Sequence, residues 1–170
     1  CLTLVAPLEP LEQALSAYAP SFNATLRARI AARLGVLPGS AEEGDQLVAA
    51  TFGFMKATGA AFERTIFDWH GGTARAAFAR HSPQAALYTG EAFDRFYASL
   101  DRHGPRGWDE QATRYFEGEA PATLLIEEVE ALWAPIAAHD DWSAFEAKLA
   151  QIERARLANG IVGRSGLERG

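Results

Sequence analysis

Apolar residues recur every three or four positions along most of this chain, a spacing that places them on one face of an α-helix. The densest run covers positions 47–72 (LVAATFGFMKATGAAFERTIFDWHGG), with Gly59 near its middle and Gly71–Gly72 at its end. Helices commonly end at glycine. The run therefore predicts two helices, over about 45–58 and 60–70, that meet at a tight corner. We expect this corner to lie at the centre of the fold.

The same spacing predicts which side chains of the corner are buried. The first helix is expected to bury Leu47, Val48, Phe52 and Met55. The second is expected to place Phe62, Ile66 and Trp69 on one stripe, with Glu63, Arg64 and Asp68 off it.

Two further helices are predicted before the corner. The first begins near Pro10 and stops at Pro20, because proline has no backbone N–H for a helical hydrogen bond. Its apolar positions are Leu11, Leu15 and Tyr18. The second ends at Gly35, which fits a left-handed C-terminal cap, and its stripe consists of Phe22, Leu26, Ile30 and Leu34.

A loop over 37–44 then leads into the corner. Ser40 followed by Glu43 matches a capping box, in which each residue bonds the backbone N–H of the other, and Asp45 is an alternative N-cap.

The second half of the chain predicts three more long helical segments and one short one. The short helix covers 73–80, before Ser82–Pro83, and an amphipathic helix covers 91–103. Positions 104–118 look irregular, but their aromatic residues, Trp108, Tyr115 and Phe116, indicate that this segment packs inward.

The last two helices start at Pro121 and Ser143. The core face of the first is expected to hold Leu124, Leu125, Val129, Leu132 and Trp133, and Pro135 is expected to end or kink that helix. Ser143 with Glu146 predicts a capping box for the second, which carries Phe145, Leu149, Ile152 and Leu157 and ends at Asn159–Gly160.

Sustained alternation of apolar and polar residues, the signature of β-strands, is not seen. The sequence thus predicts an all-α fold, a single helical domain of six to eight helices over 1–160, followed by a frayed tail over 161–170.

Composition narrows the class of protein. The 170 residues carry 16 Lys and Arg against 22 Asp and Glu, a net charge of −6, which argues against nucleic acid as a partner. Apolar runs are shorter than the ~20 residues of a membrane span, so no membrane partner is expected. Cys1 is the single cysteine, which fits a reducing, cytoplasmic setting. The chain begins without methionine, and we expect it to be a fragment of a longer protein.

Candidate chemistry is sparse. His139–Asp140–Asp141 is the best cluster of potential metal ligands, but it lies between two predicted helices, where an acidic residue favours the next N-terminus. Glu127, Glu128 and Glu130 fit an exposed acidic face, and Arg27, Arg29 and Arg33 fit a solvated basic one. Glycine-rich phosphate loops and the G-x-S-x-G nucleophile motif are absent from the sequence.

The segment Asp68–Trp69–His70–Gly71–Gly72 places polar groups beside glycines, which would allow a ligand to approach closely. A buried tryptophan at a capped helix end explains the same residues without a ligand. We therefore assign no catalytic, cofactor-binding or metal-binding residue in this chain.

Three sequence segments, taken together, resemble one protein family. PLEPLEQALSAYAPSFNATLRARIAARLGV is similar to a segment ending in an R-x-K-L-G-L-like helix end, and FMKATGAAFERTIFDWHGG to a segment containing F-E-x-x-F-F-D-W-x-G-G. ATLLIEEVEALWAPIAAHDDWSAFEAKLAQI is similar to a late segment of some bacterial members. The family is the selenoprotein O protein adenylyltransferases, and the likeness covers most of 5–155.

The resemblance implies the C-terminal helical region of a protein-kinase-like, pseudokinase fold. Family members use ATP with Mg²⁺ or Mn²⁺ to transfer AMP to Ser, Thr or Tyr hydroxyls of protein substrates. Their nucleotide-binding, catalytic and metal-binding residues lie upstream of the matching region, so none transfers to this sequence. The partner of this region is then the upstream kinase-like lobe of the same protein, and the isolated fragment is expected to be inactive and to bind no cofactor.

The family's redox-active C-terminal Cys or selenocysteine has no counterpart here, since Cys1 is the single cysteine. Two other interpretations stay open. One is a stand-alone helical protein-binding module that uses Trp108, Tyr115 and Phe116 as an exposed patch. The other is a small helical enzyme built around Asp68 and His70.

Overall fold

The computed structural model describes residues 8–161, and this part of the chain consists of α-helices joined by short connections. The α-helices are α1 (Leu8–Arg33), α2 (Ala41–Thr58), α3 (Phe62–Asp68), α4 (Ala76–Ala79), α5 (Glu91–Leu100), α6 (Glu110–Phe116), α7 (Ile126–His139) and α8 (Ser143–Ala158). Two short 3₁₀ turns, η2 (Gly72–Arg75) and η3 (Ala85–Leu87), flank α4. An isolated bridge between Val36 and Pro105 is the only β pairing among the described residues. The predicted all-α fold is confirmed, and positions 162–170 of the predicted tail lie outside the described residues.

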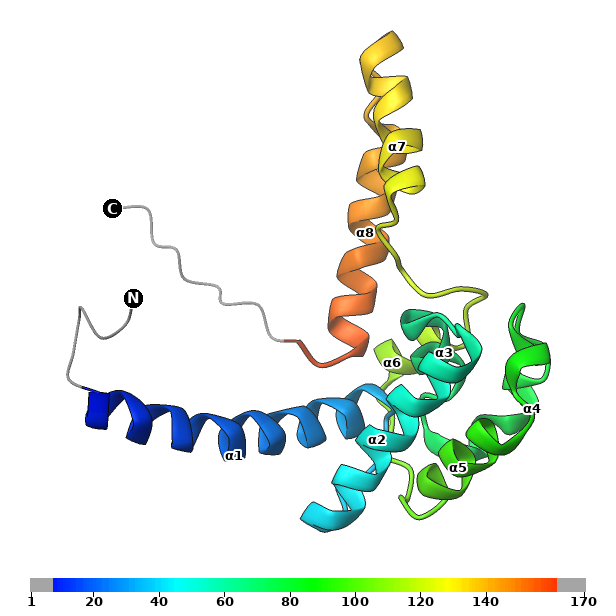
Figure 1. Ribbon diagram of the computed structural model, residues 1–170. Helices are drawn as coiled ribbons and strands as arrows, with labels where there is room; N and C mark the ends of the chain where they lie inside the picture. Colours follow the sequence, from blue (N-terminus) through cyan, green and yellow to red (C-terminus); the bar gives the residue numbers. More distant parts are fainter. Residues whose placement is uncertain (1–7, 162–170) are drawn as a thin grey trace.

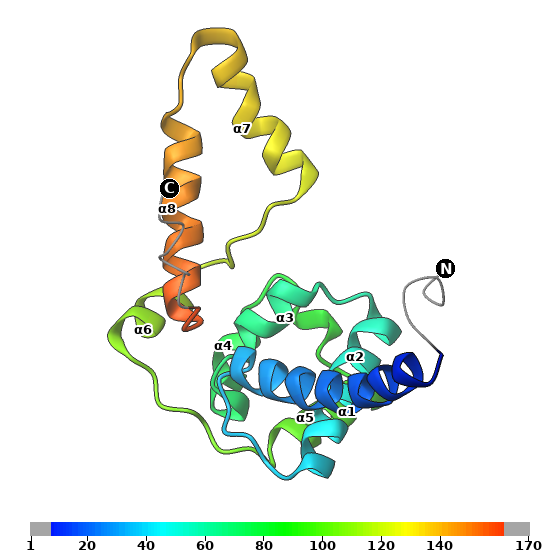
Figure 2. The ribbon, with the colours of Figure 1, turned by 90° about the vertical axis from the view of Figure 1, so that its left-hand side faces the viewer.

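The helices form a central body with two projections (Figure 1). The body contains α2 to α6 and the C-terminal half of α1. The N-terminal half of α1 extends from one side of it, and the pair α7–α8 extends from another (Figure 1). The second view also shows α7 and α8 extending away from the body (Figure 2). Within the described part, no helix is both long enough and apolar enough to cross a membrane.

The predicted corner lies in the core, as its density of apolar residues indicated. Trp69, at the end of α3, packs against aromatic side chains of α5, with ring centroids 5.5 Å from Phe93 and 5.9 Å from Phe96. The inward aromatic residue of α2 is Phe54, which is 1% exposed, whereas the predicted Phe52 is 42% exposed. This prediction was wrong because α5 packs against the side of α2 that carries Phe54, where Phe54 stacks on Phe96.

The two helices predicted before the corner are one continuous helix. Pro20 lies inside α1 and does not stop it. The ring leaves the carbonyl of Ser16 without its helical donor, but the residues around Pro20 are exposed, so water can bond to that carbonyl. The predicted end is confirmed: Gly35 has a φ of +63°, and the Val36 N–H donates to the Ala31 carbonyl at 3.0 Å, closing the helix.

The capping box before α2 forms as predicted. Ser40 accepts from the Glu43 N–H at 3.2 Å, and the Glu43 carboxylate accepts from the Ser40 N–H at 2.7 Å. The helix therefore begins at Ala41, inside the predicted loop over 37–44. The predicted irregular segment over 104–118 contains α6, which is capped by Asp109 accepting from the Ala112 N–H at 2.7 Å.

The predicted core face of the α7 region is exposed instead. No residue of α7 is buried, and Trp133 is 61% exposed. The periodicity was read correctly as helical, but within residues 8–161 only α8 lies beside this helix, so most of its apolar face is open. Two further details differ. The helix starts at Ile126 rather than Pro121, and it continues through Pro135 to His139.

The capping box predicted at Ser143 does not form. Ser143 is the first helical residue of α8, and its N–H donates to the Asp141 carboxylate at 3.0 Å. The predicted end of this helix at Asn159–Gly160 is confirmed, with Gly160 at a φ of +62°.

Candidate functional site around Asp68 and His70

The segment from Asp68 to Gly72 is fully inside the body, between α3 and η2. Asp68, Trp69 and His70 are all buried, with Asp68 completely inaccessible. Charged and polar side chains rarely occupy such positions unless hydrogen bonds and ion pairs compensate for lost hydration. The surroundings of Asp68 and His70 therefore show what this segment can do.

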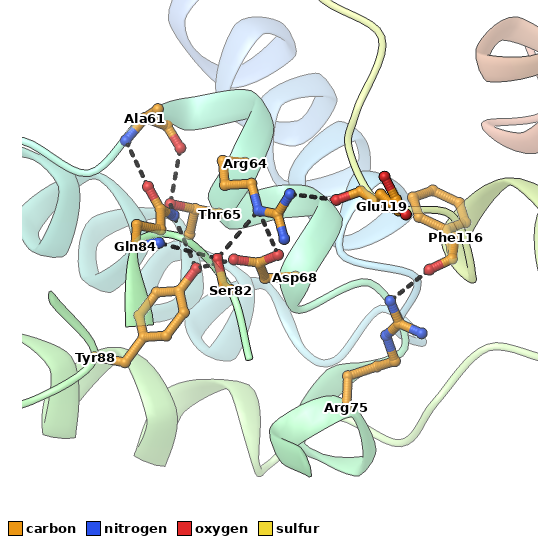
Figure 3. A network of polar contacts seen from close by, with 10 residues as sticks. All are labelled: Ala61, Arg64, Thr65, Asp68, Arg75, Ser82, Gln84, Tyr88, Phe116 and Glu119. Atoms are coloured by element: carbon orange, nitrogen blue, oxygen red, sulfur yellow. Dashed lines mark hydrogen bonds and ion pairs between the residues drawn. The ribbon is translucent and has the colours of Figure 1, made fainter. Parts of the chain in front are cut away.

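Asp68 lies at the centre of a polar network that joins three segments of the body (Figure 3). Tyr88 Oη donates to Asp68 Oδ2 at 2.5 Å, and Arg64 Nε lies 2.8 Å from Asp68 Oδ1. Burial, and after it the hydrogen bond to Asp68, raise the pKa of Tyr88, so the phenol stays protonated as a donor. Gln84 connects the network to α3 by donating to both Tyr88 Oη and Thr65 Oγ1. One carboxylate oxygen thus pairs with a guanidinium group and the other accepts a hydrogen bond.

Two arginines, Arg64 of the network and Arg75 of η2, bond to the end of α6 and to the chain that follows it. Arg64 Nη1 donates to the Glu119 carbonyl at 2.7 Å, and Arg75 Nη2 donates to the Phe116 carbonyl at 2.6 Å. Figure 3 shows both guanidinium groups reaching these carbonyl oxygens. Charge-assisted hydrogen bonds, which are the stronger class, therefore join the end of α6 to η2 and the segment that leads into α7 to α3.

His70 takes part in a separate arrangement. Its Nδ1 lies 2.8 Å from the Arg33 carbonyl, which can only accept, so Nδ1 carries the proton and Nε2 is a free acceptor. The imidazole stacks on Phe116 with ring centroids 3.5 Å apart. Burial lowers the pKa of His70 to about 4, so the ring is neutral at neutral pH.

Two glycines are required for this packing. A Cβ on Gly35 would come within 2.7 Å of both His70 Nε2 and the Gly71 nitrogen, and a Cβ on Gly71 would come within 2.6 Å of the Trp108 ring. The Gly71 N–H also donates to the Leu34 carbonyl at 2.7 Å. The glycines therefore bring the end of α1 into contact with the His70 turn, rather than opening space for a ligand.

A cavity of about 140 Å³ does border His70, between the end of α1 and the end of α8. Asn159 also lines it, and its Oδ1 is buried without a hydrogen-bond donor in the described part of the chain. His70 Nε2 and Asn159 Oδ1 both accept hydrogen bonds, so the cavity suits ordered water.

This geometry does not assemble a catalytic pair from Asp68 and His70. The carboxylate is engaged by Tyr88 and Arg64, whereas the imidazole is bonded to the Arg33 carbonyl and stacked on Phe116. A buried imidazole with a pKa of about 4 is also a weak base at neutral pH. The hypothesis of a small enzyme built on these two residues thus lacks the contact it requires, and both residues have packing roles.

Three of the other sequence candidates, Asp140, Asp141 and Glu128, have structural partners too. Asp140 accepts from Trp142 Nε1 at 2.8 Å, and Asp141 accepts from the Ser143 N–H. Glu128 bonds Thr123 and lies 3.3 Å from Lys148 Nζ, which links α7 to α8. Across residues 8–161, no three His, Cys, Asp or Glu side chains come together in an arrangement that could hold a metal ion.

Sequence reasoning missed the partners of Asp68. The i, i+4 spacing of Arg64 and Asp68 on α3 is a signal for their ion pair. Gln84 and Tyr88 lie in the irregular stretch after Ser82–Pro83, where no periodicity indicates which way a side chain points.

The described part of this chain is thus an all-α region with a well-packed aromatic core and a buried polar network around Asp68. A family model described as "Protein adenylyltransferase SelO" matches residues 1–153. The chain belongs to this family.

A curated relative agrees with that assignment. The protein nucleotidyltransferase YdiU of Gloeobacter violaceus is 30% identical over 156 residues, which cover 85% of this chain and 31% of the relative. The chain therefore spans about a third of the length of the curated relative that it matches. No solved structure matches this chain.

Proposed function

We propose that this chain is the C-terminal helical region of a protein adenylyltransferase that transfers AMP from ATP to Ser, Thr or Tyr hydroxyls of other proteins. The observation that carries the proposal is the family match over residues 1–153, in a chain that spans about a third of a curated relative named as a protein nucleotidyltransferase. The catalytic residues then belong to a kinase-like lobe that precedes this region in the same polypeptide.

In this proposal the chain contributes structure rather than chemistry. ATP, with Mg²⁺ or Mn²⁺, supplies the adenylyl group in the preceding lobe, and the protein substrates dock there. Nucleotidyl transfer depends on accurate positioning and on electrostatic stabilisation. A rigid helical region, held by the Asp68 network and the aromatic core around Trp69, is suited to supporting such a lobe. The isolated chain is expected to be inactive.

The experiment that tests this proposal is to read the coding DNA upstream of Cys1. We expect an open frame that encodes a kinase-like region with a Lys–Glu pair for the nucleotide, and with Asn and Asp residues for the metal. A stop codon or a start site directly upstream would contradict it.

The alternative is a stand-alone helical protein-binding module. Its predicted patch, formed by Trp108, Tyr115 and Phe116, is not found on the surface. Phe116 is 1% exposed, and Trp108 and Tyr115 are half-buried in a cluster with Phe67. The exposed large apolar residues lie elsewhere: on α1 and α2, in the loop before α2, and from the segment before α7 to the residues after α8.

A further inference from the structure

One stripe of apolar side chains runs along α1, but only its C-terminal half is covered. Each member follows the previous one by three or four residues, from Leu15 through Tyr18, Phe22, Leu26 and Ile30 to Leu34. Ile30 and Leu34 are buried, and Leu26 packs against the same core. In contrast, Leu15 and Tyr18 are each 63% exposed and Phe22 is 49% exposed.

Helix geometry explains why α2 cannot cover the whole stripe. Side chains four residues apart on a helix differ in direction by about 40°, so a stripe with this spacing winds around the helix. Leu15, Tyr18 and Phe22 therefore face a different direction from Ile30 and Leu34. A cover for them must come from another element, and α1 projects away from the body at this point (Figure 1).

The uncovered residues form one ordered patch, which we call the α1 ridge: Leu15, Tyr18 and Phe22. The rings of Tyr18 and Phe22 stack, with centroids 5.7 Å apart. Most helical stability in proteins comes from packing of an apolar face rather than from intrinsic propensity. A projecting half-helix that contains Pro20 has little other support, so the α1 ridge fits a surface that is buried in the complete protein.

The length of the family protein indicates what covers the ridge. The family model includes all of α1, and this chain accounts for 31% of the curated relative. A second copy of the chain fits less well. Three side chains of this size, each about half exposed, offer roughly 300 Å², whereas a stable dimer buries about 800 Å² on each partner. Packing within one polypeptide does not carry the entropy cost of association, so a patch of this size is sufficient there.

We propose that the α1 ridge is the surface against which the preceding part of the longer family protein packs. This inference rests on the proposed function, which places that part in the same polypeptide. It names the contact through which this region joins the lobe that precedes it.

The test compares amide hydrogen exchange in two proteins, the 170-residue chain and the longer protein that contains it. If the α1 ridge is covered, amides of residues 12–22 exchange at least about a hundredfold more slowly in the longer protein. The variant Leu15→Gln/Tyr18→Gln/Phe22→Gln should remove this protection and lower the Tm of the longer protein. It should leave the Tm of the 170-residue chain unchanged, because the three side chains are exposed there. The matched control is Trp133→Gln on α7, which should leave the exchange of α1 unchanged.

The inference would be overturned if residues 12–22 exchanged equally fast in both proteins. It would also be overturned if the triple substitution left the Tm of the longer protein unchanged. Protection that appears in the 170-residue chain as its concentration rises would also overturn it, since the cover would then be a second copy. AMP transfer by the longer protein is measured alongside. Activity with an unprotected α1 overturns this inference alone, and protection without activity overturns the proposed function alone.

Discussion

At the scale of single residues, burial sets the chemistry of the Asp68–Gly72 segment. His70 shows this directly, because its pKa of about 4 lies well below the ordinary value of 6.5. Desolvation disfavours the charged imidazole, and nearby arginines oppose it further. The folded state therefore excludes a proton that the unfolded chain accepts.

This difference predicts a pH-dependent stability. Between about pH 6.5 and pH 4 the unfolded state binds the proton and the folded state does not, so the free energy of unfolding falls as the pH is lowered through this range. The loss amounts to about 3 kcal/mol if the full shift is expressed. Urea unfolding at pH 7 and pH 4.5 measures it, with His70→Gln as the variant without a titrating ring. Parallel pH dependences for the wild type and the variant would show that His70 is not the group responsible.

Two aromatic residues of the predicted corner differ in depth, and their truncations should differ accordingly. Trp69 is 2% exposed, so Trp69→Ala is expected to cost about 3–5 kcal/mol. Phe62 is half-buried, so Phe62→Ala should cost less, about 1–2 kcal/mol. Denaturant unfolding of both variants checks the order. A loss below about 1 kcal/mol for each would mean that this corner is not the centre of the fold.

At the scale of helices, local signals explain much of what could be predicted. The capping box at Ser40 and Glu43 was readable because both partners lie within one turn. Gly35 and Gly59 were readable as helix ends because few other residues adopt positive φ values at low cost. The amphipathic helix predicted over 91–103 followed from its regular period, and α5 covers most of that range.

Other features depend on neighbours that a linear pattern does not contain. Phe52 is exposed and Phe54 is buried because α5 packs against the side of α2 that carries Phe54. Pro20 and Pro135 were expected to stop or bend helices, yet both lie inside helices near exposed residues. The core face predicted around Trp133 was identified as apolar, but most of it is exposed among the described residues.

The two predicted capping boxes give a matched pair of substitutions. Ser40→Ala removes a side-chain bond to the Glu43 N–H and should lower the free energy of unfolding by about 1 kcal/mol. Ser143→Ala removes a hydroxyl that does not cap α8, so its effect should stay within about 0.5 kcal/mol. Thermal or urea unfolding of the two variants compares them directly. A larger loss at Ser143 than at Ser40 would contradict the observed caps.

At the scale of the whole molecule, the body and its projections have different roles. The body is held by the aromatic core around Trp69 and by the Asp68 network. The projections, by contrast, carry large apolar side chains that are exposed among the described residues. The proposed role, a supporting region of a longer protein, is consistent with both properties.

The most direct test of the proposed function measures the transfer of labelled AMP from ATP to protein substrates in the presence of Mg²⁺ or Mn²⁺. The account predicts that the longer protein containing this chain labels Ser, Thr or Tyr residues, while the 170-residue chain alone labels none. The His70→Gln variant of the longer protein should label its substrates nearly as well as the wild type, because His70 has a packing role. This comparison is made above pH 6.5 and below the Tm of the variant. Labelling by the 170-residue chain alone, or none by the longer protein, would contradict the account.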